Sequence, residues 1–273
     1  MPFLTVGEEN AAPVRLYYED HGTGRPVVLV PAWPLNAASW ESQEAALLAA
    51  GHRVVSYDRR GFGRSDRPWD GYDLDTLATD LHTLVTALDL RDATLVGYSL
   101  GGGEVTRYLA VHGSGRVRSA VLIAAAPPYP CGAHDRPGSG ALSALRETVV
   151  TDRAAFMTGY LHDLYAVDLL RGAGVSERVA AYHRGVGLES SARATTACAD
   201  AWGTDLRPDL PRIDVPVLVL HGAADRTLPP GVTAEPLAAL LADATLRIVP
   251  GAPHGLIFTH AEEVNSELAA FLA

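Results

Sequence analysis

The chain has 273 residues, of which 48% are hydrophobic and 20% are charged, a composition typical of one globular domain and not of a disordered or fibrous protein. It carries 22 basic and 32 acidic residues, so its formal net charge of −10 makes nucleic acid and anionic membrane surfaces unexpected partners. Every basic residue is an arginine, and the lack of lysine excludes a lysine Schiff base and the lysine of a phosphate-binding P-loop.

The cysteine content and the composition of the first residues further restrict the class of protein. The two cysteines, Cys131 and Cys198, are too few for a disulfide scaffold or a four-cysteine metal site. The first residues do not resemble a signal peptide, and apolar runs such as 121–126 are far shorter than a membrane span. No histidine and carboxylate cluster with metal-ligand spacing stands out. We therefore expect a cytoplasmic protein with no metal or other cofactor and a small molecule as its partner; its oligomeric state stays open.

Short apolar runs predict buried parallel strands in the first half of the chain. They are rich in β-branched side chains and cover residues 27–30, 53–57, 93–96 and 119–123. Apolar residues recur every three or four positions from Leu74 to Leu88, which predicts an amphipathic helix between the second and third runs. Strand and helix alternate, so the sequence predicts an α/β fold with a mostly parallel central sheet flanked by helices.

The pattern changes after residue 126. A proline-rich segment at 127–130 ends the alternation, and helical patterns follow at residues 154–165, 177–183 and 191–201. Strand-like runs return only at residues 215–220 and 245–249. We interpret residues 127–211 as a helical cap, or lid, inserted into a core made of residues 1–126 and 212–273. The alternative is that these helices extend the core.

The segment Gly97-Tyr98-Ser99-Leu100-Gly101 matches the glycine-x-serine-x-glycine pattern of a nucleophile elbow. A predicted strand precedes it, and residues 103–111 after it have a helical pattern. A strand-to-helix turn of this kind presents the serine hydroxyl at the carboxyl edge of the sheet, beside the N–H groups of the first helical turn. The alternative is a glycine-rich turn that only packs.

A serine nucleophile needs a base, and the base needs a carboxylate that orients it. In sheets of this kind the acid and the histidine follow the serine in chain order, each in the loop after a later strand. Asp225 lies after the strand predicted at 215–220, and His254 lies after the next one. We therefore expect Ser99, Asp225 and His254 to form a catalytic triad; the alternatives are a turn aspartate and a surface histidine. His221 is expected to be a structural hydrogen-bonding residue.

These motifs resemble the α/β-hydrolases, and within that fold the cofactor-free bacterial haloperoxidases, perhydrolases and aryl esterases. The matching segments are Trp33-Pro34-Leu35 with Ser39-Trp40, residues 57–65, residues 94–105, and residues 215–222 with Asp225. The resemblance implies a serine hydrolase of small to medium carboxylic esters, in which Ser99 is acylated and the acyl group passes to water or to hydrogen peroxide. A peracid made in this way oxidises halide without haem or metal.

The resemblance also implies which backbone N–H groups stabilise the oxyanion, namely those of Leu100 and Trp33. Members of the family usually carry histidine-glycine just before the tryptophan, where this chain has Pro31 and Ala32. Because proline has no N–H, Pro31 cannot donate. In the enzymes that the chain resembles, proline at the position of Pro34 accompanies perhydrolase activity.

Substrate selection is expected to depend on the cap. The candidate pocket residues are Pro34, Tyr98, Phe156, Met157, Tyr160 and Trp202. Aromatic residues on a lid helix also often serve packing alone. Two other functions stay open: a secondary-metabolite tailoring hydrolase, such as a lactonase or lactamase with the same triad, and a triad-bearing binding protein with little turnover. Dehalogenases and epoxide hydrolases of this fold use an aspartate nucleophile, and Ser99 argues against both.

Overall fold

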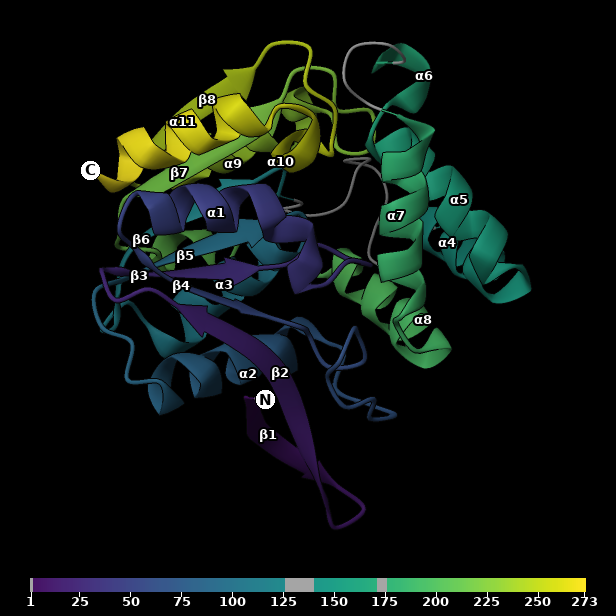
Figure 1. Cartoon of the computed structure of the whole chain (residues 1–273), viewed down its shortest axis with the longest axis horizontal. Helices are drawn as coiled ribbons and strands as arrows, with labels where there is room; N and C mark the ends of the chain where they lie inside the picture. Colours follow the sequence, from purple (N-terminus) through teal and green to yellow (C-terminus); the bar gives the residue numbers. More distant parts are fainter. Residues whose placement is uncertain (1, 126–139, 171–175) are drawn as a thin grey trace.

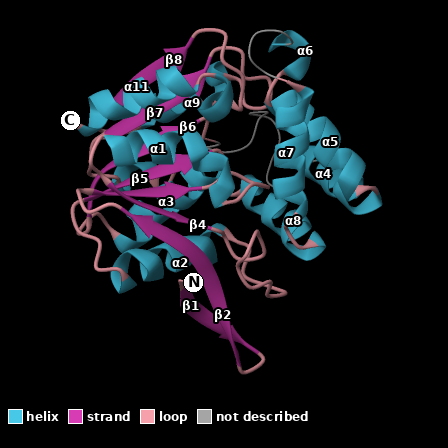
Figure 2. Ribbon diagram, in the orientation of Figure 1, coloured by secondary structure: helices cyan, strands magenta, loops and turns pink. Residues whose placement is uncertain are grey.

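A mixed eight-stranded sheet forms the centre of the protein in the computed structural model, which describes residues 2–125, 140–170 and 176–273 (Figures 1 and 2). Its strand order is β1-β2-β4-β3-β5-β6-β7-β8. The six strands from β3 onward pair in parallel: β3 (Pro26–Val30), β4 (Arg53–Tyr57), β5 (Ala93–Tyr98), β6 (Val117–Ile123), β7 (Val217–Gly222) and β8 (Ala244–Val249). The predicted mostly parallel sheet is confirmed, and each apolar run forms one of its strands.

The first two strands were not predicted from the sequence. Strands β1 (Phe3–Glu9) and β2 (Ala12–His21) form an antiparallel hairpin, and β2 also pairs antiparallel with β4. Strand β1 is exposed or half-buried throughout, so polar residues occupy many of its positions and no apolar run marks it. The tip of this hairpin extends away from the rest of the sheet (Figure 1).

Helices cover both faces of the sheet. Helices α1 (Glu41–Ala49) and α11 (Ala261–Leu272) contact each other over one face, and α2 (Leu74–Ala87) and α3 (Leu100–His112) contact each other over the opposite face (Figure 1). Helix α9 (Ala234–Leu240) packs against β7 and β8, and α10 (Leu256–Thr259) contacts α11. Helix α2 begins and ends close to the predicted bounds, and its apolar stripe is buried as expected. None of the helices in the described ranges is long and apolar enough to cross a membrane.

Among the described residues between β6 and β7, the chain forms five α-helices. They are α4 (Gly140–Thr151), α5 (Arg153–Leu164), α6 (Val167–Leu170), α7 (Glu177–Leu188) and α8 (Ala192–Ala199). Helices α4, α5, α7 and α8 lie side by side at one end of the sheet (Figure 2). Helices were expected at 154–165, 177–183 and 191–201, and α5, α7 and α8 occupy these positions. The expected cap boundary near residue 126 and Cys131 lie outside the described residues.

The turn from β5 to α3 is tightly packed. Ser99 has a φ of 53°, in the left-handed region, and α3 begins at the next residue, earlier than the sequence pattern indicates. A Cβ atom on Gly97 would lie 2.4 Å from the Gly101 carbonyl oxygen. A Cβ atom on Gly101 would lie 2.4 Å from the carbonyl oxygen of Val30, at the end of β3. Both glycines are therefore required because backbone passes directly against backbone.

We predict that Gly101→Ala lowers the free energy of unfolding by about 1–3 kcal/mol, since neighbouring main-chain carbonyls cannot move aside as a flexible side chain can. Gly103→Ala in the same helix is the matched control. Its Cβ atom would meet only side-chain methyl groups, of Leu206 at 3.4 Å and of Leu74 at 3.6 Å. Alanine also favours a helix interior over glycine by about 1 kcal/mol. Urea unfolding of both variants measures the difference, and equal stability would contradict the packing argument.

Candidate functional site

Ser99, His254 and Asp225 form one continuous hydrogen-bonded chain. The Ser99 Oγ lies 3.0 Å from His254 Nε2, and His254 Nδ1 lies 2.7 Å from Asp225 Oδ2. Ser99 follows β5, Asp225 follows β7 and His254 follows β8, so parallel strands bring all three to one edge of the sheet. All three residues are at most 3% exposed. The structure thus brings together the three side chains that the loop positions predicted.

The Asp225 carboxylate is held in its charged form by several donors. Burial raises its pKa, but the charge of His254 and hydrogen bonds from His221, His254 and the Leu228 N–H outweigh burial, so the net pKa lies well below its usual value of 3.8. The Leu228 N–H lies 2.7 Å from Asp225 Oδ1. The carboxylate therefore remains negative at neutral pH and can orient and stabilise a charged imidazole at His254.

His221 supports this carboxylate from the end of β7. Its Nε2 lies 3.1 Å from Asp225 Oδ2 and 2.7 Å from the Leu228 carbonyl oxygen. Both partners accept hydrogen bonds, so Nε2 must carry the hydrogen. The histidine ring is fully buried, as expected of a residue that holds the acid in place.

The loop after β3 lies against the Ser99 turn and is tied to it by a buried ion pair. Arg59 Nη2 donates to the Pro31 carbonyl oxygen at 2.6 Å, and Arg59 Nε donates to Glu104 Oε2 at 2.9 Å. Glu104 lies in α3, the helix that begins directly after Ser99. Burial lowers the pKa of Arg59, but the charge of Glu104 outweighs it and the net direction is upward. One guanidinium thus connects the loop with the serine helix.

Neither Arg59 nor Glu104 was predicted as a site residue. Both lie in segments that carry the family resemblance, 57–65 and 94–105, and this was the only signal available for them. Their pairing could not be derived from spacing, because they come from different elements and meet only after the sheet has formed.

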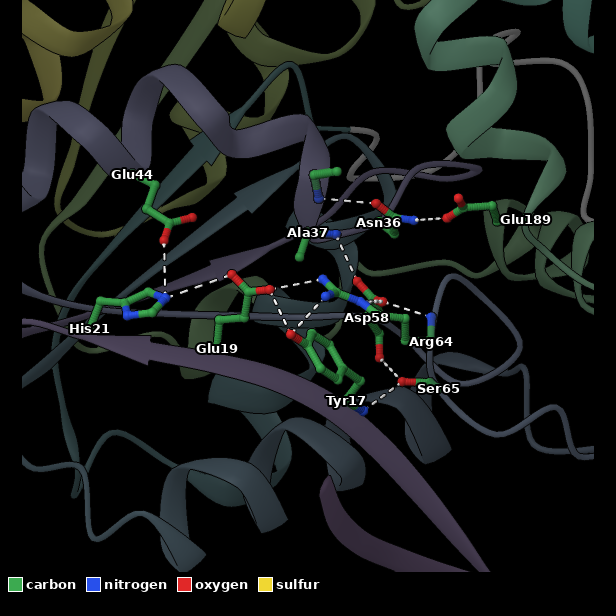
Figure 3. Close-up of polar contacts among 11 residues, drawn as sticks. Tyr17, Glu19, His21, Asn36, Ala37, Glu44, Asp58, Arg64, Ser65 and Glu189 are labelled. Atoms are coloured by element: carbon green, nitrogen blue, oxygen red, sulfur yellow. Dashed lines mark hydrogen bonds and ion pairs between the residues drawn. The ribbon is translucent and has the colours of Figure 1, made fainter. Parts of the chain in front are cut away.

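A second polar network holds the far end of the same loop (Figure 3). Asp58 Oδ1 accepts from the Ala37 N–H at 3.0 Å, and Asp58 Oδ2 accepts from the Arg64 N–H at 2.8 Å. Asn36 Nδ2 donates to Glu189 Oε2 at 3.1 Å, just beyond the end of α7. The loop is therefore anchored to the sheet domain by Asp58 and to the helices between β6 and β7 by Asn36.

The candidate pocket residues of the helices and of the loop after β3 lie around Trp33 and Gly187. The rings of Phe156, Tyr160 and Trp202 surround the Trp33 ring, with centroids 6.0, 5.3 and 5.0 Å from it. Pro34 and the buried Met157 both lie near Gly187 of α7. A Cβ atom added to Gly187 would lie 3.4 Å from Pro34 Cγ and 3.5 Å from Met157 Sδ. The Trp33–Pro34 peptide bond is cis.

Tyr98 packs beneath the loop that carries His254. It is fully buried, its hydroxyl donates to the His254 carbonyl oxygen at 3.1 Å, and its ring packs against Trp40. The contacts of Tyr98 are therefore those of a residue that supports the loop carrying His254.

Within the described part of the chain, Glu19, His21 and Glu44 form a group of potential metal ligands (Figure 3). Their nearest ligand atoms lie within 4.8 Å of one another. This group was not predicted from the sequence, because Glu19 and His21 lie in the unpredicted strand β2 and Glu44 lies in α1. Glu19 also pairs with Arg64 at 2.9 Å and accepts from the Tyr17 hydroxyl at 2.7 Å, so part of its charge is already balanced.

We predict that Asp225 makes stability depend on pH. Because its folded pKa is lowered, its contribution is present above about pH 4 and is lost as the pH falls below that value. The stability advantage of the parent over Asp225→Asn should therefore shrink by about 1 kcal/mol between pH 5 and pH 3. Urea unfolding of both proteins at each pH measures this change. A difference that stays constant with pH would contradict the lowered pKa.

Comparisons with known proteins agree with this geometry. A family model for the alpha/beta hydrolase fold matches residues 25–261. A putative non-heme chloroperoxidase of Synechocystis sp. is 47% identical over 100% of both chains. A bifunctional esterase/perhydrolase of Acinetobacter calcoaceticus is 36% identical, with 95% of this chain and 96% of that protein aligned.

Solved structures lead to the same family. The crystal structure of a bromoperoxidase from Bacillus anthracis superposes with a TM-score of 0.92 at 40% identity, covering 99% of each chain. An esterase from Exiguobacterium antarcticum superposes with a TM-score of 0.87 at 31% identity, covering 95% of this chain and 96% of the other. With the sheet order and the family match, these similarities establish that the chain belongs to the α/β-hydrolase family and is an enzyme of that type, as the sequence motifs indicated.

Proposed function

We propose that this enzyme is a serine hydrolase that cleaves small to medium carboxylic esters through an acyl-enzyme on Ser99. The observation that carries the proposal is the unbroken hydrogen-bonded chain from Ser99 through His254 to Asp225. In this mechanism His254 takes the proton of the Ser99 hydroxyl as the oxygen attacks the ester carbonyl, and then gives it to the leaving alcohol. The Asp225 carboxylate fixes the imidazole tautomer and stabilises the imidazolium. Water then attacks the acyl-enzyme with His254 as base.

The N–H groups of Trp33 and Leu100 are the proposed oxyanion donors. In the described segments, neither amide donates a hydrogen bond to a protein acceptor, so both are available to an incoming oxyanion. Leu100 is also the first residue of α3, whose N-terminal end favours negative charge. The loss of one such donor typically lowers kcat by about 10²- to 10³-fold.

We further propose that hydrogen peroxide competes with water for the acyl group, which would make a peracid. Support comes from the similarity to a protein named as an esterase/perhydrolase and to proteins named as non-heme haloperoxidases. Pro34 follows the proposed donor Trp33 and fixes its own φ near −65°. Proline also restricts the preceding residue to extended conformations, which orients the Trp33 carbonyl. A carbonyl oriented in this way can accept a hydrogen bond from peroxide and so favour the attack of peroxide on the acyl group.

We propose that helices α4–α8 act as the cap that selects the ester. Phe156, Tyr160 and Trp202 reach from these helices and from the short 3₁₀ helix Asp200–Gly203 to the ring of Trp33. Since Trp33 is a proposed oxyanion donor, side chains around its ring would contact groups bound next to the reacting carbonyl.

We predict that Ser99→Ala abolishes ester turnover, with a loss in kcat on the order of 10⁶-fold. A panel of p-nitrophenyl esters of rising acyl length measures turnover, and a fluorophosphonate probe should label the parent but not the variant. Ser114→Ala, in the half-buried bend before β6, is the matched control and should keep the parent's turnover. Residual activity above a few per cent in pure Ser99→Ala would remove this serine from the nucleophile role.

The same assays separate the two alternative functions. A parent that neither turns over esters nor reacts with the probe would favour a binding protein. Turnover of lactones or lactams alone would favour a tailoring hydrolase.

We predict that Pro34→Leu lowers the ratio of perhydrolysis to hydrolysis, because the Trp33 carbonyl would no longer be oriented to accept a hydrogen bond from peroxide. The ratio is measured by supplying an acetate ester with peroxide and quantifying peracid and free acid in the same reaction. Pro13→Leu, at an exposed position of the N-terminal hairpin, is the control and should keep the parent ratio. An unchanged ratio in Pro34→Leu, or no peracid from a parent with clear esterase activity, would count against peroxide as an acyl acceptor.

A further inference from the structure

The aromatic cluster around Trp33 contains polar atoms as well as rings. The rings of Tyr160 and Trp202 lie 5.3 and 5.0 Å from that of Trp33, and 6.5 Å from each other. Trp33 Nε1 donates to the Thr195 carbonyl oxygen at 3.0 Å, so the polar group of the central ring is satisfied by the protein.

The two surrounding polar groups are not satisfied. Tyr160 Oη and Trp202 Nε1 are both buried from solvent, and neither has a hydrogen-bond partner within the ranges that the structure describes. Leaving a buried donor unpaired costs about 1–3 kcal/mol, and most buried polar atoms in folded proteins are paired. Other nearby tyrosines follow this rule, since the hydroxyls of Tyr98 and Tyr72 donate to main-chain carbonyls. Two unpaired donors in one cluster therefore suggest a ligand.

Their position links this ligand to the reacting centre. Trp33 belongs to the same hydrophobic cluster as Leu100, and these two residues are the proposed oxyanion donors. Burial raises the pKa of Tyr160, and the negative charge of Asp225 raises it further. The Tyr160 hydroxyl therefore stays neutral and lies within the field of Asp225.

The chemistry of the two groups defines the partner. An indole N–H can only donate, and a neutral phenol can donate as well. One oxygen with two lone pairs can accept from both. The negative charge of Asp225 disfavours a carboxylate next to Tyr160, so the matching group is an uncharged acceptor.

We propose that Tyr160 and Trp202 form a donor pair that recognises an uncharged acceptor oxygen, in a keto, ether or second ester group, on the acyl or the alcohol part of the substrate. The proposal rests on the proposed ester hydrolase function and adds its substrate class. It makes the enzyme selective for oxygenated esters over hydrocarbon esters of the same shape, and it assigns a role in specificity to both residues.

The test compares esters that differ only by replacement of a methylene group with oxygen. For the acyl part the pair is p-nitrophenyl pentanoate and p-nitrophenyl 3-methoxypropanoate. For the alcohol part it is pentyl acetate and 2-ethoxyethyl acetate. The kcat/KM ratio, oxygenated over hydrocarbon, is expected to fall about 3- to 10-fold in Tyr160→Phe and Trp202→Phe for one of the two pairs, which identifies the part of the substrate that is recognised.

Matched controls use the same substitutions on the surface. Tyr182→Phe removes a hydroxyl that bonds Glu41 at 2.9 Å on an exposed side chain, and Trp69→Phe changes a side chain that is 65% exposed. Both controls should keep the parent ratios. Equal losses on both esters of each pair in Tyr160→Phe and Trp202→Phe, or unchanged ratios, would overturn the proposal and leave these residues as packing or as contacts to water.

A binding measurement separates this proposal from the proposed function. Titration calorimetry of the Ser99→Ala protein with the four esters needs no turnover. The oxygenated ester of one pair should bind more tightly, and adding Tyr160→Phe should remove that preference. If the parent hydrolyses no ester but the preference is present, the hydrolase proposal fails while the recognition proposal stands. If all four esters bind equally, or none binds, the recognition proposal is overturned.

Discussion

The close approach of two backbone segments is the constraint on which the site depends. The turn at Ser99 lies against the carbonyl groups at the end of β3, so closely that a Cβ atom on Gly101 would overlap Val30. Arg59 holds the segments together by donating to the Pro31 carbonyl and to Glu104 of α3. The two amides proposed to stabilise the oxyanion, those of Trp33 and Leu100, come from these two segments. The two segments are thus held against each other by main-chain packing and by the buried Arg59–Glu104 ion pair.

Burial gives the electrostatic interactions of this edge their strength. Asp225 keeps its charge although it is 3% exposed, because His254, His221 and a backbone amide all face it. Charged hydrogen bonds of this kind are stronger in a site with little water than on the surface. Burial raises the pKa of the Tyr160 hydroxyl and keeps it neutral, and the negative charge of Asp225 adds to this effect. A single buried carboxylate thereby orients the proposed base and restricts which groups can bind beside the Trp33 ring.

The sequence predicted the parts of this site that depend on chain order. Apolar runs located the parallel strands, and the loops after them placed Asp225 and His254 at the same edge as Ser99, where the side chains meet. The N-terminal hairpin escaped prediction because polar residues interrupt its largely exposed first strand. The partnership of Arg59 with Glu104 could not be predicted, since it depends on the distance between elements that are remote in the chain.

The anchoring of the loop after β3 also explains how it holds its position with proline and alanine at the two positions where the family resemblance led us to expect histidine and glycine. Pro31 has no N–H to offer, but its carbonyl is the group that Arg59 uses, so the residue serves as an acceptor. Ala32 is fully buried, and its small side chain fits a position that has no access to solvent. Further along, Asp58 accepts from the Ala37 N–H and fixes the other end of the loop. Because both ends are held by contacts that do not involve a histidine or a glycine, the loop can keep its place against the Ser99 turn without them.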